Sequence, residues 1–310
     1  MRLCQIKTGT GVEVGVQAPS GAVIRLAALS GNAPATMVAL ADAVAEGRLD
    51  LATLATEVSA LTPADEARLA ARTLALPDFA APVTRPPKFF AIAINGRANW
   101  ERSIKPDNAK AQYFIKLHTC ITGPGDPIEL PDIGSVGPEV ELALVIGKGG
   151  KHIPEAAAMA HVLGYTIHND LTAHDLRAKS EWIRLRRKDG SEEQLTYPGR
   201  WKNFDTFSPM GPWLITPNEV PDPHALHMTA TLNGEVVQDG TTADCVYRIP
   251  ELIAYLSAAH TLEPGDIIST GTVPAAAPWT MAGIHLRKFG GVIDCEIAGF
   301  GRLSNPIKAV

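Results

Sequence analysis

The chain has 310 residues, of which 45% are hydrophobic and 20% charged, which is ordinary globular material for one large domain or a large and a small one. The formal net charge of -5 excludes a general nucleic-acid binder, because Lys and Arg are not in excess to neutralise phosphates. The N-terminus lacks the apolar core of a signal peptide, and no apolar run is long enough to span a membrane. The four cysteines form no C-x-x-C pair. We therefore expect a cytoplasmic protein without a membrane partner or a structural zinc site.

The first part of the chain predicts a small α+β domain over residues 1–82. Alternating valines up to residue 16 and the run 23–26 indicate short strands. Apolar residues spaced i, i+3, i+4 and i+7 predict helices over 37–44 and 51–58. Thr62-Pro63 resembles a helix start and predicts a third helix through Leu74. These helices carry no cluster of titratable groups, so we assign them a packing or interface role.

A proline-rich segment that ends at Pro87 separates this region from a mostly β domain over residues 83–310. Apolar runs bounded by Gly and Pro predict its strands at 89–94, 113–117, 142–146, 162–168, 213–215, 267–270 and 292–297. Asn233-Gly234 between two alternating runs predicts a hairpin over 226–238. One helix is expected over 250–260. The fold class is therefore α+β with more strand than helix.

Residues 136–147 place two carboxylates in what otherwise reads as a core strand. Glu139 and Glu141 share one face, roughly 6.5 to 7 Å apart, because side chains alternate along a strand. In a partly buried site their repulsion is about 2 kcal/mol, so they need a proton, a cationic side chain or a divalent ion nearby. The alternative is a strand that starts at a sheet edge with both acids in water. The strand alone leaves these alternatives open.

A third acid, Asp170, ends the strand-like segment that begins at Gly164. Two Glu and one Asp form an oxygen-only set, which favours Mg²⁺ or Mn²⁺ over zinc because no Cys or paired His accompanies them. The alternative is an aspartate that only caps a helix.

Five motifs closely resemble, in order and spacing, the fumarylacetoacetate hydrolase family. They are GPEVELALVIG (137–147), GYTIHNDLTAHDL (164–176), KNFDTFSPMGP (202–212), LNGEVVQDG (232–240) and LEPGDIISTGT (262–272). The resemblance covers residues 88 to 306. It implies a β-roll catalytic domain, a homodimer, and Mg²⁺ or Mn²⁺ held by Glu139, Glu141 and Asp170.

The resemblance also implies a chemistry. Members of this family act on small 2-oxo acids and β-dicarbonyl acids, through a metal-bound enolate that leads to carbon–carbon hydrolysis, decarboxylation or tautomerisation. By similarity Lys202 lies near the developing oxyanion as a cation, and Thr272 contacts the substrate carboxylate. The alternative for Lys202 is a surface lysine.

The segment 95–102 departs from the family pattern. Hydrolytic members carry a His–Glu pair here that activates water. In this chain Asn99 stands in the place of the histidine and Arg102 in the place of the glutamate. Asn cannot accept a proton from water, so that route is absent in this register, and Glu101, one position off, could compensate only if the segment bulges. We place Asn99 among the catalytic residues, with Asn95 and Arg97 as substrate-binding residues.

Two further departures follow Asp170. Relatives place an Arg and a Gln over the substrate where this chain has His174 and Arg177, so we expect His174 to replace the missing base and Arg177 to bind substrate. Alternatively, His174 only binds Asp175. Residues 181–200 are longer than the usual segment, and the basic run 184–188 either attracts an anionic substrate or is a solvated loop.

The leading hypothesis is a divalent-metal-dependent enzyme for a small anionic oxo acid or diketone. Loss of the His–Glu pair favours decarboxylation or tautomerisation over hydrolysis, because neither needs an activated water. The rival hypothesis is a family member that has lost catalysis and binds a metal or a metabolite.

Overall fold

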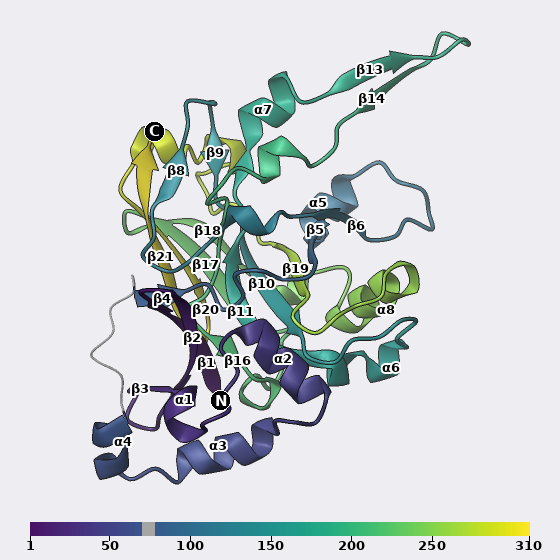
Figure 1. Cartoon of the computed structure of the whole chain (residues 1–310). Helices are drawn as coiled ribbons and strands as arrows, with labels where there is room; N and C mark the ends of the chain where they lie inside the picture. The colour runs from purple at the N-terminus through teal and green to yellow at the C-terminus, as the bar shows by residue number, and fades with distance from the viewer. Residues whose placement is uncertain (70–77) are drawn as a thin grey trace.

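Figure 1 shows the computed structural model, which describes residues 1–69 and 78–310. Its largest sheet has ten strands in the order β3-β2-β1-β16-β11-β10-β19-β5-β6, with β4 paired to β1. Their bounds are β1 Arg2–Thr8, β2 Gly11–Gln17, β3 Val23–Arg25, β4 Phe79–Ala80, β5 Phe89–Ala93, β6 Gln112–Ile115, β10 Val140–Ile146, β11 Val162–Asn169, β16 Leu214–Ile215 and β19 Ile267–Thr272. Predicted strands of both regions are therefore present in this one sheet, whereas the predicted strand at 292–297 and the hairpin at 226–238 lie in a second sheet.

The N-terminal strands join the rest of the chain through β1 and β16, where Arg2 pairs with Ile215. The helices near them are α1 Leu26–Leu29, α2 Met37–Ala45, α3 Leu51–Ser59 and α4 Pro63–Leu69. Both α2 and α3 match the predicted spacing, and the Thr36 and Asp50 side chains cap them by accepting backbone N–H bonds. The predicted third helix begins at Pro63, and its expected end at Leu74 lies outside the described residues. The domain boundary at 82/83 stays a prediction.

A second sheet has five strands in the order β18-β17-β20-β21-β8. Their bounds are β8 Ile128–Leu130, β17 His227–Leu232, β18 Glu235–Thr241, β20 Val292–Ile297 and β21 Gly301–Ala309. The predicted hairpin is confirmed, because Asn233 and Gly234 join β17 to β18 with φ values of 53° and 85°, as a type I′ turn requires. The predicted helix at 250–260 is α8, Ile249–Ala259.

Strand β10 lies in the middle of the large sheet, between β11 and β19, and all seven of its residues are buried. Ala143 and Val145 pack in the core beside the N-terminal strands and helices, whereas Leu142 and Leu144 pack in the core of the second sheet. This confirms that both faces of the strand are buried. The carboxylates at its start therefore lie at the edge of two apolar cores.

Shorter elements surround the end of β10 at which the acids lie. They are α5 Arg97–Arg102, α7 His174–Lys179, α9 Leu286–Phe289, β7 Ile121–Thr122, β9 Val136–Gly137, β12 Thr172–Ala173 and β15 Ser208–Pro209, whereas α6 Glu155–Ala158 packs against α8. None of the described helices is both long and apolar enough to cross a membrane.

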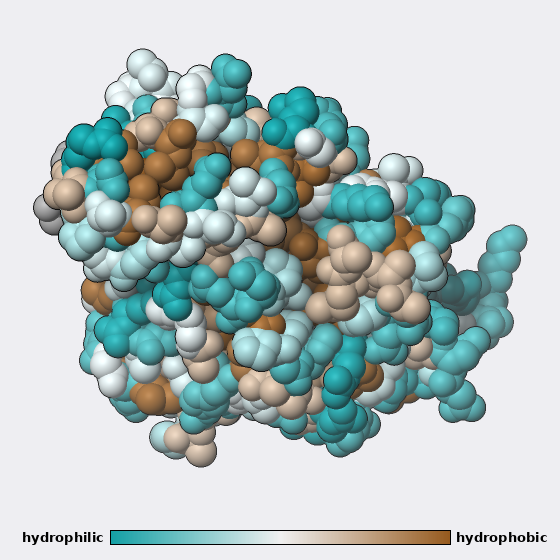
Figure 2. Space-filling view, turned by 90° about the horizontal axis from the view of Figure 1, so that it is seen from below, coloured by the Kyte–Doolittle hydropathy of each residue, from teal (hydrophilic) through white to brown (hydrophobic). Residues whose placement is uncertain are grey.

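The longer segment after α7 forms a hairpin of β13 Ile183–Arg186 and β14 Glu192–Leu195, which projects from the molecule at the upper right of Figure 1. Its basic residues pair across the hairpin, Arg186 with Glu192 at 2.6 Å and Arg187 with Glu193. This arrangement favours a solvated hairpin. Figure 2 shows hydrophobic residues scattered among hydrophilic ones on the face seen from below, and no continuous stripe of either kind.

Candidate metal centre

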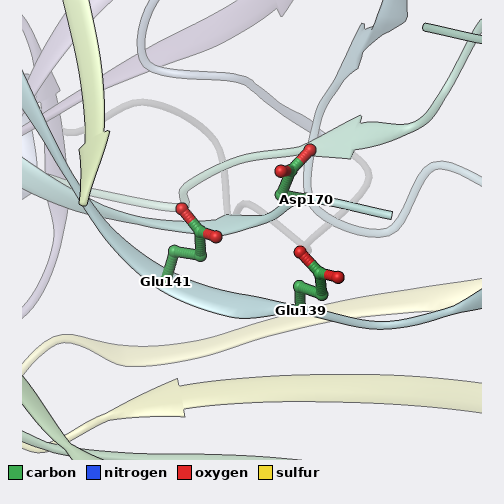
Figure 3. Close-up of side chains that lie close together, drawn as sticks. All are labelled: Glu139, Glu141 and Asp170. Atoms are coloured by element: carbon green, nitrogen blue, oxygen red, sulfur yellow. The ribbon is translucent and has the colours of Figure 1, made fainter. Parts of the chain in front are cut away.

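Three carboxylates converge at the end of β10. Glu141 lies in β10, Glu139 just precedes it, and Asp170 directly follows β11, as Figure 3 shows. The backbone N–H of Asp170 donates to the carbonyl of Glu139 at 2.9 Å, which fixes the two chain segments side by side. Each side chain offers one oxygen within 4.8 Å of the others. The sequence thus predicted a cluster that the register of two neighbouring strands brings together.

The alternatives left open for these residues are now decided by burial. Glu141 is 2% exposed and Asp170 1%, so a strand start with both acids in water is wrong. Asp170 is not a helix cap either, because its two carboxylate oxygens accept from lysines and the residue that precedes α7 is Ala173. The acids are part of a buried charged cluster.

Lys202 supplies one counter-charge from a 3₁₀ turn, Arg200–Lys202. Its ammonium group donates to Glu139 Oε2 at 2.8 Å and to Asp170 Oδ2 at 2.5 Å. It is 4% exposed, so the alternative of a surface lysine is wrong. Burial alone would lower the pKa of Lys202, but the charges of the three acids outweigh it and raise the pKa above its usual value. The side chain is a permanent cation.

A second buried lysine, Lys116, was missed by the sequence analysis. It follows β6, and its ammonium group donates to Asp170 Oδ1 at 2.7 Å and to the carbonyl of Phe207 at 3.2 Å. Burial would raise the pKa of Asp170, but Lys116 and Lys202 lower it well below the usual range. A lysine directly after an apolar strand was the signal that could have identified it, because such a side chain is expensive to bury without a partner.

The cluster still has excess negative charge. Three carboxylates and two ammonium groups sum to -3 + 2 = -1 when all are ionised. Burial, followed by the charge of Asp170, raises the pKa of Glu141 to about 8. The cluster thus favours one more positive charge, either a proton on Glu141 or a bound cation.

The oxygen atoms of the three carboxylates suit a divalent cation. Both oxygens of Asp170 and both of Glu139 accept hydrogen bonds, Glu139 from Thr172 Oγ1 at 2.7 Å as well as from Lys202. Glu141 Oε2 accepts from Ser269 at 2.5 Å and from the Gly271 N–H at 3.0 Å. Within the described part of the chain Glu141 Oε1 has no such partner, and Glu141 lines the pocket described next. Carboxylate oxygens are the ligands that Mg²⁺ and Mn²⁺ prefer. Glu139, Glu141 and Asp170 are the residues that would hold the ion.

A pocket of about 270 Å³ opens onto these carboxylates. Its wall brings together most of the predicted site residues, namely Asn95, Asn99, Glu139, Glu141, Asp170, Arg177, Lys202 and Thr272. Thr196 and Pro198, which follow the projecting hairpin, also line it. An adjoining hollow of about 230 Å³ shares Gly96, Asn99 and Thr272 with the pocket. The site therefore has room beyond the carboxylates for a small organic acid.

Residues 95–102, the segment that departs from the family pattern, hold one buried and two exposed candidate site residues. Asn95 is buried, and its amide bonds the backbone of Tyr247 and Thr270, so it anchors the wall. Asn99 is exposed in α5, and its carbonyl oxygen accepts from Arg102 at 2.8 Å. Arg97 is exposed and lines only the adjoining hollow. Asn99 thus faces the pocket, but its oxygen is already occupied by the arginine that replaces the family's glutamate.

His174 and Arg177 lie on α7 in different surroundings. The His174 Nε2 atom is buried without a hydrogen-bond partner in the part of the chain that the structure describes, and it packs over Gly137. Burial is the main cause that lowers the pKa of His174. His174 is not among the pocket-lining residues, whereas Arg177 is one of them and lies over the Trp201 ring at 5.3 Å. This placement favours Arg177, rather than His174, as a residue that meets substrate.

Two further buried side chains, His168 and Ser269, also escaped the sequence analysis. His168 in β11 lies opposite Glu141, and its Nδ1 is 2.7 Å from the hydroxyl of Ser269. Burial lowers the pKa of His168 to about 3, so the ring is neutral. A histidine inside an apolar strand was the available signal.

Comparison with known proteins agrees with this geometry. The sequence model of the family described as "Fumarylacetoacetate (FAA) hydrolase C-terminal" matches residues 88–308. The chain is 36% identical to the human "Oxaloacetate tautomerase FAHD2A, mitochondrial" over 99% of this chain and 91% of that protein. It is 38% identical to an uncharacterized protein of Pyrococcus abyssi over 73% of this chain and 92% of that protein.

Solved structures share the whole fold. A fumarylacetoacetate hydrolase from Exiguobacterium antarcticum aligns with a TM-score of 0.76 at 26% identity, covering 100% of both chains. A maleylpyruvate hydrolase from Sphingobium sp. SYK-6, solved with manganese(II) and pyruvate, aligns with a TM-score of 0.72 at 27% identity, covering 100% of this chain and 99% of that one. The resemblance seen in the five sequence motifs is thereby confirmed, and the chain belongs to the fumarylacetoacetate hydrolase family.

Proposed function

We propose that this protein is a Mg²⁺- or Mn²⁺-dependent tautomerase of a small 2-oxo dicarboxylic acid such as oxaloacetate. The observation that carries the proposal is the place of the hydrolytic base. Asn99 occupies it, and the Asn99 oxygen accepts from Arg102, so among the described residues these two positions hold no water-activating His–Glu pair. Keto–enol interconversion moves a proton between carbon and oxygen and requires no such pair.

Relatives and structural neighbours support this proposal at two levels. The human relative is named an oxaloacetate tautomerase. The maleylpyruvate hydrolase neighbour was solved with manganese(II) and pyruvate, a 2-oxo acid. The carboxylate oxygens of Glu139, which is partly buried, and of the buried Glu141 and Asp170 have the chemistry for the same kind of ion.

The side chains of the pocket have different roles in this proposal. A divalent ion held by Glu139, Glu141 and Asp170 would supply Lewis-acid polarisation of a substrate carbonyl. Lys202 adds a fixed positive charge beside the carboxylates, where negative charge would develop on a substrate oxygen. Arg177, at the pocket wall, supplies a cation for a substrate carboxylate, and stacking on Trp201 holds it in place.

A tautomerase also needs a group that carries the proton. Outside the metal-binding set, the carboxylates that line the pocket and its adjoining hollow, within the described residues, are Glu101 and Asp244. Glu101 lies on α5, one turn of helix from Arg97. We assign the proton transfer to Glu101, because its helix borders the pocket and the adjoining hollow.

The test follows the decay of enolic oxaloacetate by its ultraviolet absorbance, with added Mg²⁺ or Mn²⁺ and with a chelator. We expect metal-dependent acceleration of the keto–enol exchange, with little release of pyruvate or carbon dioxide and no hydrolysis of acylpyruvates. Exchange unchanged by the chelator would contradict the metal dependence. Rapid pyruvate release would instead identify a decarboxylase. Tight Mn²⁺ binding without turnover of any oxo acid would support the rival hypothesis of a binding protein.

A further inference from the structure

His168 is a fully buried titratable residue that the proposed chemistry does not use. Its ring packs against Phe89, with centroids 5.1 Å apart, and its Nε2 atom has no hydrogen-bond partner in the described part of the chain. Its Nδ1 atom lies 2.7 Å from Ser269 Oγ. The three strands β11, β10 and β19 are neighbours in the sheet, so His168 and Ser269 approach Glu141 from its two sides.

The directions of these hydrogen bonds follow from the donors available. Glu141 Oε2 accepts the backbone N–H of Gly271 at 3.0 Å, and it also accepts the single hydroxyl proton of Ser269 at 2.5 Å. Ser269 Oγ can then only accept from the histidine, so His168 carries its proton on Nδ1 and leaves Nε2 bare. His168 thus donates a hydrogen bond to Ser269, and Ser269 donates one to Glu141.

The hydrogen bonds from Ser269 and Gly271 use one oxygen of the Glu141 carboxylate completely. A carboxylate oxygen has two lone pairs, and both on Oε2 are used by Ser269 and Gly271. Within the described residues Oε1 has no donor, and Glu141 lines the pocket. A cation can therefore be bound through Oε1 alone.

We propose that His168 is a positioning residue that holds Glu141, through Ser269, as a single-oxygen ligand and so selects Mg²⁺ or Mn²⁺ against Ca²⁺. The inference rests on the metal site of the proposed function. Mg²⁺ and Mn²⁺ suit octahedral sites of single carboxylate oxygens, whereas the larger Ca²⁺ takes more oxygens and commonly binds both oxygens of a carboxylate. A carboxylate released from Ser269 can turn and offer both oxygens.

The test measures ion affinities without substrate. Free Mn²⁺ is followed by electron paramagnetic resonance, and Ca²⁺ is added as a competitor, which gives the ratio of the Ca²⁺ and Mn²⁺ dissociation constants. In Ser269→Ala we expect this ratio to fall about tenfold, as for other residues that orient metal ligands. His168→Phe should lower it in the same direction by a smaller factor. His168→Asn, whose amide can still donate to Ser269, should keep the ratio near that of the wild type.

The double variant shows whether His168 acts on Glu141 through Ser269 or whether the two residues affect ion selectivity independently. Because His168 acts through Ser269, Ser269→Ala combined with His168→Phe should change the ratio no more than Ser269→Ala alone. Thr270→Val is the matched control, because Thr270 lies on the same strand and donates a buried hydrogen bond at 2.9 Å to the Leu142 carbonyl without touching Glu141. Its ratio should equal that of the wild type.

Two results overturn the inference. One is a ratio in Ser269→Ala that moves no more than in Thr270→Val, and the other is additive effects of the two single variants. If His168→Phe does not fold, as judged by its thermal unfolding curve, the smaller change Ser269→Ala still decides the matter. Wild-type protein that binds no Mn²⁺ overturns the inference together with the metal site. Wild-type protein that binds Mn²⁺ but turns over no oxo acid contradicts only the proposed function, and the ratios still decide whether His168 acts through Ser269.

Discussion

The ammonium group of Lys116 donates a hydrogen bond of 2.5 Å to the backbone carbonyl of Lys202. Each of these lysines also donates to a different oxygen of Asp170, Lys116 at 2.7 Å and Lys202 at 2.5 Å. Lys116 is therefore placed to fix both the acid and the main chain that carries the second cation. Lys116, Asp170, Lys202 and Glu139 thus form one connected network of hydrogen bonds, so the loss of one of them is expected to affect the others.

The first prediction concerns the stability of this network. Lys116→Met should lower the free energy of unfolding of the chelated, metal-free protein by about 3 kcal/mol, because it leaves Asp170 buried with half of its counter-charge. Urea denaturation measures the change. The control is Lys308→Met, which breaks the exposed pair with Glu129 and should cost less than about 1 kcal/mol. Equal losses of unfolding free energy in the two variants would show that the buried ion pair stabilises the protein no more than the exposed one.

The second prediction concerns the metal ligands. Glu139→Gln keeps the size of the side chain but removes a charge that lies beside Lys202. We expect a fall in Mn²⁺ affinity of about tenfold or more and loss of tautomerase activity, with an unchanged circular dichroism spectrum. Glu129→Gln is the matched control on the surface. Near-wild-type affinity and rate in Glu139→Gln would refute the assignment of this ligand.

A third prediction follows from the neutral His168. Its pKa is lowered by burial to about 3 from the usual 6.5. Between pH 3 and pH 6.5, His168 binds a proton in the unfolded chain but not in the folded chain. The free energy of unfolding therefore falls as the pH falls below about 6.5. The loss from this group is about 1.4 kcal/mol per pH unit, and none is expected above that range.

Urea unfolding between pH 7 and pH 5 tests this sign. His168→Phe should lose less stability over that interval than the wild type, because it has no buried ring to protonate. Both proteins are measured with a chelator, so that metal binding does not contribute. A wild type and a variant with parallel pH profiles would show that this histidine is not the acid-sensitive group.

The fourth prediction concerns Cys245, which lines the hollow beside the pocket. Burial, and then the negative charges of Glu141 and Asp244, raise the pKa of its thiol to about 12. At pH 8 the thiolate fraction is then about 10⁻⁴, so iodoacetamide should alkylate Cys245 only slowly in the folded protein, and faster as the pH rises. Mass spectrometry of the digested protein measures this reaction. All four cysteines should react rapidly in urea, and fast labelling of native Cys245 would contradict the prediction.

The fifth prediction decides the role of the projecting hairpin. Its arginines are exposed and pair with Glu192 and Glu193, so replacing Arg184, Arg186 and Arg187 by Gln should change KM by less than about twofold. Arg177→Gln, at the pocket wall, should raise KM about tenfold or more by removing a cation from the substrate. A large rise in KM in the triple variant would instead assign the hairpin an electrostatic steering role.

The elements that the sequence predicted well are those with a strong local signal. The helices at α2 and α3 and the hairpin at Asn233-Gly234 are encoded by spacing and turn chemistry within a few residues. The joining of β1 to β16 is not, because it depends on pairing between residues more than 200 positions apart. Periodicity indicates that a strand exists, but it carries no information about which strand lies beside it.

For the site, the sequence by itself determined the chemical type: three carboxylates at strand ends, an oxygen-only set, and a segment in which Asn99 and Arg102 replace a His–Glu pair. The tertiary structure decided the rest. It buried Lys116 beside Asp170, left His174 outside the pocket-lining residues, and set His168 and Ser269 on the two strands that flank the strand of Glu141. The physical reason is that a charge or a hydrogen bond acts over a few ångströms in space. Only the tertiary fold, through strand pairing and the packing of the segments that carry Lys116 and Lys202, brings residues 116, 141, 168, 202 and 269 within that range.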